Sequence, residues 1–124
     1  MSPAAAYLDA LARFADFDGR TSRRAFVGFW AVHAAVTVVL GLASALVGTW
    51  MDLAWIAGSA VLALYLVLTF FPALGVLARR LHDTGRTSWL VALLGLPPLG
   101  LLVLWWCLQP GEAGPNDWGR PGDE

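Results

Sequence analysis

The 124-residue sequence has few charged side chains, no lysine and a single cysteine. Charged residues make up 14% of the chain, against roughly 25% in soluble domains. Hydrophobic residues make up 58%, and the mean hydropathy is +0.64. This composition excludes an ordinary soluble domain and indicates a membrane protein. The lone Cys107 cannot form an internal disulfide, and no CxxC motif or Cys/His group suggests metal or redox chemistry. We expect no cofactor, no metal and no nucleic-acid partner.

Three long runs carry no formal charge. They cover residues 25–51, 53–78 and 89–108, which is 27, 26 and 20 residues. About 20 apolar residues are needed to cross the hydrocarbon core as a helix. The sequence therefore predicts an all-α integral membrane protein with three transmembrane helices, a short N-terminal amphipathic helix and an extended C-terminal tail.

The predicted elements form one membrane domain over residues 1–124. They are an interfacial helix at 3–16, a first span at 22–51, a second span with a cytoplasmic extension at 53–84, a third span at 88–108 kinked at 97–98, and a tail at 109–124. Pro97 and Pro98 leave an alternative, in which the third segment folds back as a re-entrant hairpin. We favour a crossing helix, because the turn of a hairpin would expose unpaired carbonyls to lipid.

Arginines set the expected orientation. Seven of the eight lie before the first span or between the second and third, and only Arg120 lies in the tail. By the positive-inside rule this places the N-terminus in the cytoplasm. Three spans then put the tail in the periplasm. The order of residues at the N-terminus is not that of a secretory signal peptide.

Residues 3–16 have the periodicity of an amphipathic helix. Tyr7, Leu8, Leu11 and Phe14 would share one face. Such a helix would lie either on the membrane surface or against the ends of the spans.

The segment ARRLHDTGRTS at 78–88 concentrates charge between two apolar runs. Continuation of the second helix would pair Arg79 with Asp83 at i, i+4, and Gly85 would supply a left-handed C-cap. Thr87 or Ser88 is expected to cap the next helix, and Thr21 or Ser22 the first span.

Two roles are open for this charge. The arginines could only set topology and extend to phosphate headgroups. Alternatively, Asp83 pairs across helices with Arg20, Arg23 or Arg24, and the remaining guanidinium groups bind a lipid phosphate or another anion. The candidate cluster consists of Arg20, Arg23, Arg24, Arg79, Arg80, His82, Asp83 and Arg86.

An enzyme is not expected. His82 and Asp83 are the only apparent base and orienting carboxylate, but adjacent helical residues point about 100° apart. No serine, cysteine or second carboxylate stands in an obvious partner position, so we assign no catalytic residue.

His33 is the intramembrane polar candidate. It lies at the depth of Pro72 and Pro97, and each proline frees the carbonyl four residues earlier. We expect His33 to donate to one of these carbonyls, at Leu68 or Leu93, in preference to a proton-relay or ligand role. Small residues spaced four apart, such as Ser44 and Gly48, favour close helix contact.

Three blocks together resemble a known family. They are FDGRTSRRAF at 17–26, RRLHDTGR at 79–86 and PGEAGPNDWG at 110–119, and they are similar to the signatures of bacterial inner-membrane proteins catalogued as domain of unknown function 805. The resemblance covers about residues 4–121. It implies a small inner-membrane protein with no assigned reaction, ligand or catalytic residue.

The sequence thus predicts a non-enzymatic membrane module that presents the arginine cluster at the cytoplasmic interface to anionic phospholipid headgroups or to a partner protein. Its expected partners are the bilayer and either a second copy of itself or another membrane protein. The alternative is a subunit of a small oligomeric transporter or channel, with His33 lining a pathway.

Overall fold

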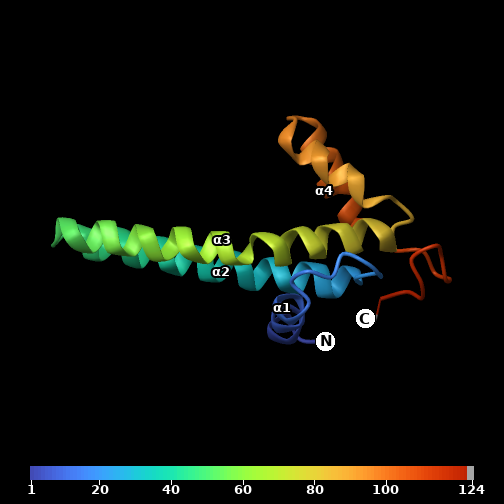
Figure 1. The fold of residues 1–124 in the computed structure, drawn as a ribbon, viewed down its shortest axis with the longest axis horizontal. Coiled ribbons are helices and arrows are strands. Elements are labelled where there is room, and N and C mark those ends of the chain that lie inside the picture. Colours follow the sequence, from blue (N-terminus) through green and yellow to red (C-terminus); the bar gives the residue numbers. More distant parts are fainter. Residues whose placement is uncertain (123–124) are drawn as a thin grey trace.

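The computed structural model describes residues 1–122, which form four α-helices and one 3₁₀ helix (Figure 1). The helices are α1 (Pro3–Ala12), α2 (Arg23–Gly48), α3 (Asp52–Asp83), the 3₁₀ helix η1 (Ser88–Gly95) and α4 (Leu99–Leu108). No strand forms within 1–122 beyond an isolated bridge between Asn116 and Gly119. The predicted all-helical class is confirmed for this part of the chain.

Helices α2 and α3 form a long antiparallel hairpin and are the two candidate membrane spans. At 1.5 Å per residue they are about 39 and 48 Å long, more than the roughly 30 Å of a hydrocarbon core. The most apolar 18-residue stretches of α2 and α3 are only 6% and 28% buried. Their exposed side chains are largely Val, Leu, Ile and Phe, the surface expected of helices in lipid.

Small residues let α2 and α3 approach closely. A Cβ added at Gly58 would overlap Ser44, and one added at Gly48 would lie 2.8 Å from the Cβ of Trp55. The close helix contact predicted from these residues is therefore confirmed, and it lies within one chain.

Helix α1 packs against the first turns of α2, on the side away from α4 (Figure 1). Its buried residues are Ala6 and Ala10, and Gly28 of α2 lets the backbone of Pro3 come close. The helix ends at Ala12 and not at residue 16, and the predicted apolar face is rotated, since Leu8 remains 63% exposed. Two small residues give a closer fit to α2 than the larger side chains would.

The third predicted span is corrected by the structure. Residues 88–108 form η1 and α4, which pack against each other as a hairpin, and both ends of this hairpin lie beside the C-terminal end of α3 (Figure 1). Pro97 and Pro98 form the turn. Proline has no N–H and disfavours a helical residue before it, and Leu96 is accordingly extended.

The turn satisfies three of the carbonyls that we expected to be exposed. Leu96 N–H donates to Leu93 O at 3.0 Å, Gly100 N–H to Leu96 O at 3.1 Å, and Leu101 N–H to Pro98 O at 3.0 Å. These bonds weaken the main physical objection to a hairpin.

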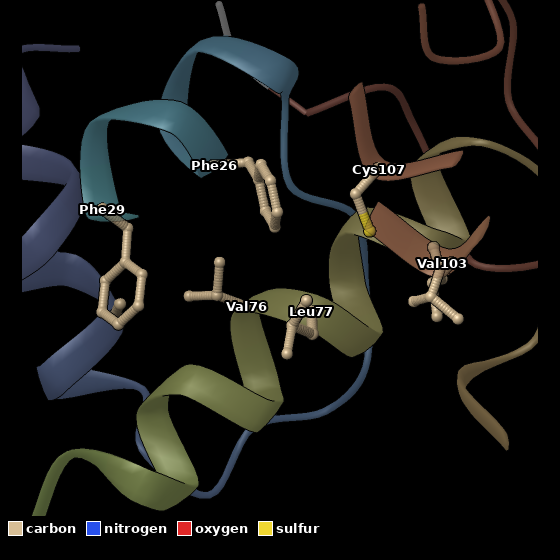
Figure 2. Packing of buried hydrophobic residues seen from close by; sticks show 8 residues of the cluster. Phe26, Phe29, Val76, Leu77, Val103 and Cys107 are labelled. Carbon is tan, nitrogen blue, oxygen red and sulfur yellow. The ribbon is translucent and has the colours of Figure 1, made fainter. Parts of the chain in front are cut away.

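The hydrophobic core lies at one end of the molecule, where all four α-helices meet. Figure 2 shows this packing, with Phe26 and Phe29 from α2, Val76 and Leu77 from α3, and Val103 and Cys107 from α4. Ala10 and Leu81 complete the buried cluster. The far half of the α2–α3 hairpin has no such core, so this end holds the fold together.

The tail, residues 109–122, lies at the same end and packs against the last turn of α3. Placement of the tail at the opposite end from the arginines, as a crossing third span requires, is therefore corrected as well.

Candidate functional site

The candidate site is built around the C-terminal end of α3. Gly85 has φ +74°, Arg86 N–H donates to Leu81 O at 2.8 Å, and Gly85 N–H donates to His82 O at 3.0 Å. This is a Schellman cap, as expected for glycine at that position. It fixes the last turn of α3, so that Arg79, Arg80, His82 and Asp83 are all buried.

Asp83 lies between two guanidinium groups. Arg20 Nε donates to Asp83 Oδ1 at 2.8 Å, and an Arg80 terminal nitrogen donates to Asp83 Oδ2. The pairing across helices is therefore with Arg20 and not with Arg23 or Arg24. Along α3 the partner is Arg80, at i, i+3, and not Arg79 as the i, i+4 spacing predicted.

Arg80 is 0% exposed and holds the end of the hairpin. Its Nε donates to Cys107 O at 2.7 Å, and its terminal nitrogens donate to Gln109 O and to Thr21 O. Cys107 lies in the last turn of α4 and Gln109 follows that helix, where the helix dipole is negative. The arginine thus caps α4 with a positive charge.

Arg20 holds the tail. Its terminal nitrogens donate to Gly114 O at 2.7 Å and Glu112 O at 2.6 Å, and to Asp83 O at 3.2 Å. Glu112 N–H in turn donates to Asp83 O at 2.7 Å. The Asp83 carboxylate and the backbone carbonyls of the tail together compensate the buried charge of Arg20.

Arg79 ties the connection between α1 and α2 to α3. It donates to Thr21 Oγ1 at 3.2 Å and to Asp16 O, and its own carbonyl accepts from Thr21 N–H at 3.1 Å. The hydrogen bond from Arg13 holds the pKa of the Asp16 carboxyl below its usual value. Asp16 therefore stays ionised at neutral pH beside Arg79.

His82 is enclosed by the tail. Its ring stacks on Trp118 with centroids 4.6 Å apart and 6° between planes, and its Nδ1 lies 3.0 Å from Gly19 O. Asn116 Nδ2 donates to His82 O at 2.9 Å. His82 and Asp83 therefore have separate partners and do not form a base and its orienting carboxylate.

The remaining arginines lie at the surface. Arg23 and Arg24 in the first turn of α2 are exposed, and Ser22 caps that helix, its Oγ accepting from Ala25 N–H at 3.1 Å. Arg86 is half-buried, with its guanidinium 4.9 Å from the centre of the Trp106 ring. The predicted cluster is thus divided into an internal part and a surface part.

His33 takes a different partner from the one predicted. Its Nδ1 lies 3.0 Å from Tyr65 Oη, which lies 2.9 Å from Tyr7 Oη, and it stacks on Phe29. The carbonyls freed by proline are not involved. The polar chain His33, Tyr65 and Tyr7 instead links α2 and α3 to α1.

Sequence reasoning missed the tail and the two tyrosines. Asn116 and Trp118 lie in the third family-like block, which is the one signal that could have drawn them into the site. Tyr7 and Tyr65 carry hydroxyl groups within apolar stretches, and a buried hydroxyl usually requires a polar partner.

These features define a helical membrane protein with an internal arginine–aspartate network at one end. The chain belongs to the family described as Protein of unknown function (DUF805), whose profile matches residues 14–120, and the resemblance of the three blocks is confirmed. It is 32% identical over 116 residues to inner membrane protein YhaI of Escherichia coli strain K12, covering 92% of each chain. It is 35% identical over 115 residues to inner membrane protein YhaH of the same strain, covering 91% of this chain and 92% of the relative. No solved structure gives a significant match.

Proposed function

We propose that this protein is a non-enzymatic module of the bacterial inner membrane that presents surface arginines to anionic lipid headgroups at the cytoplasmic side. Three observations support a place in that membrane: two long helices with exposed apolar surfaces, relatives that are named inner membrane proteins, and arginines gathered at one end.

The observation that carries the proposal is the division of the cluster. Asp83, Arg20 and Arg80 are used internally, to hold the hairpin and the tail against α3. Arg23 and Arg24 stay exposed at the start of α2. The internal network fixes the shape of this end, so Arg23 and Arg24 are held at a fixed position on the surface. Each arginine near an anionic membrane surface contributes about 1 kcal/mol to the free energy of binding to that surface.

The proposed topology differs from that of a three-span protein. Two spans and a hairpin would leave both termini and all eight arginines in the cytoplasm, because α2 and α3 return the chain to the side from which it started. The hairpin of η1 and α4 would enter only the cytoplasmic leaflet of the membrane.

The geometry around the candidate residues also favours a non-enzymatic role. His82 is covered by Trp118, and Asp83 is held between two arginines. No observation favours the transporter alternative, since His33 is engaged with Tyr65 and packed against Phe29 and Trp30.

Lipid analysis of the purified protein tests the proposal. We expect phosphatidylglycerol to be enriched over phosphatidylethanolamine relative to the source membrane, as measured by mass spectrometry of the co-purified lipid. The R23Q/R24Q double variant should lose most of this enrichment, because both exposed charges are removed. R120Q, which removes an exposed arginine from the tail, is the matched control and should retain it. A wild-type protein with no enrichment of anionic lipid would contradict the proposal.

A further inference from the structure

An apolar groove runs between the two spans and the hairpin. Its volume is about 460 Å³, within the range of ligand pockets, roughly 300–1,000 Å³. Only apolar atoms line it, and the residues come from four elements: Phe26, Trp30, Leu77, Leu94, Leu104 and Leu108. Figure 1 shows the hairpin of η1 and α4 projecting away from α2 and α3.

A positive charge stands at one end of this groove. Arg23 precedes Phe26 by three residues and Trp30 by seven, so all three lie on one face of α2. Arg23 is exposed. Its neighbour Arg24 precedes Gly28 by four residues and thus faces the side of α2 on which α1 packs.

The ring of Trp30 lines the groove about 10 Å further along α2 than Arg23. Its indole N–H is buried and does not open into the groove. A cation and an apolar lining thus follow one another along one face of α2.

We propose that the groove binds one acyl chain of an anionic glycerophospholipid. Arg23 binds the phosphate, and the chain lies against Trp30 and the leucines of α3, η1 and α4. The cation and the apolar groove follow one another along α2 in the order of phosphate and hydrocarbon in the lipid. This inference rests on the proposed function, since it requires the arginine end to lie at the headgroup level.

Native mass spectrometry of the detergent-solubilised protein, titrated with phosphatidylglycerol or phosphatidylcholine, tests the site. We expect one tightly bound phosphatidylglycerol per chain and weaker binding of phosphatidylcholine. R23Q should weaken the phosphatidylglycerol complex about tenfold, because one charge-assisted contact is lost. R24Q removes the same charge one residue away, on another face, and should change binding less than twofold.

Two further variants probe the apolar part. L104W fills the groove and should abolish the one-to-one complex, whereas L102W places the same side chain on α4 outside the groove lining and should leave the complex intact. Circular dichroism verifies the fold of each variant.

The outcomes separate this site from the proposed function. If phosphatidylglycerol is preferred but R23Q and R24Q act equally and L104W has no effect, headgroups bind at the surface arginines and the groove site is wrong. If L104W instead abolishes a dimer in the wild-type spectrum, a second copy occupies the groove, which also overturns the inference. No preference for phosphatidylglycerol in the wild type overturns both proposals.

Discussion

Arg20 and Asp83 are 63 residues apart in the chain and form a buried ion pair, with Arg20 Nε 2.8 Å from Asp83 Oδ1. Their side chains are 0% and 5% exposed. Asp83 also contacts Arg80, so that one carboxylate joins the start of the first span, the end of the second and the residues that follow the hairpin.

A double-mutant cycle tests this connection. Arg20→Ala and Asp83→Ala should each lower the free energy of unfolding by about 3–5 kcal/mol, because each leaves a buried charge without its partner. The coupling between them should be about 0.5–3 kcal/mol, measured by chemical denaturation in detergent. Arg24→Ala, which removes an exposed arginine, should be additive with Asp83→Ala. Strictly additive effects of Arg20→Ala and Asp83→Ala would show that the pair makes no energetic contribution.

Arg80 should not tolerate lysine. Its guanidinium donates from all three nitrogens to acceptors in different directions, at Cys107, Gln109, Thr21 and Asp83. A lysine ammonium has no matching fork, so Arg80→Lys should cost about 1.5–3 kcal/mol for each charged hydrogen bond left unmade. The melting temperature measures the loss. Arg24→Lys at the surface is the control, and equal melting temperatures for the two variants would contradict the prediction.

A methyl group at Gly111 should release the tail. A Cβ there would overlap the Asp83 carboxylate, whereas one at Gly114 meets no atom within 4 Å. Neither glycine has a positive φ, so the comparison isolates the steric contact. We expect Gly111→Ala to increase hydrogen exchange across residues 111–119, including the Glu112 amide that donates to Asp83. Gly114→Ala is the control and should show the hydrogen exchange of the wild type. Wild-type exchange in Gly111→Ala would contradict the contact between the tail and Asp83.

Cysteine labelling tests the topology. In a Cys107→Ala background, Ala113→Cys in the exposed part of the tail should react with a membrane-impermeant maleimide only after the membrane is permeabilised. Met51→Cys, in the turn between α2 and α3 at the other end of the molecule, should react in intact cells. Labelling of Ala113→Cys in intact cells would place the tail in the periplasm.

Local signals predicted most of the fold. Uncharged length located α2 and α3, glycine at 85 predicted the cap of α3, and Ser22 was among the expected caps of α2. These features depend on residues a few positions apart, which a single sequence displays. The four-residue spacing of Ser44 and Gly48 likewise predicted a close helix contact, but it did not show that Ser44 would meet Gly58 of α3.

The hairpin and the partners of the arginines could not be predicted in this way. Crossing was favoured because a turn in lipid leaves carbonyls unpaired, but the bonds that satisfy Leu93 and Leu96 form only in the folded turn. Arg80 binds Cys107 O and Gln109 O, and a carbonyl carries no sequence signature, since every residue has one. The sequence did predict that Asp83 pairs with an arginine, because an aspartate in a segment of arginines is not needed to set the membrane topology.

The reach of Arg20 along the chain has a consequence for biogenesis. Its carbonyl acceptors at Glu112 and Gly114 lie 92 and 94 residues later, so they are synthesised after α2 and α3. Until then the guanidinium has only its acceptors on Asp83, and its other N–H groups need water. Assembly of this end is therefore a late event, completed after both long helices have been synthesised.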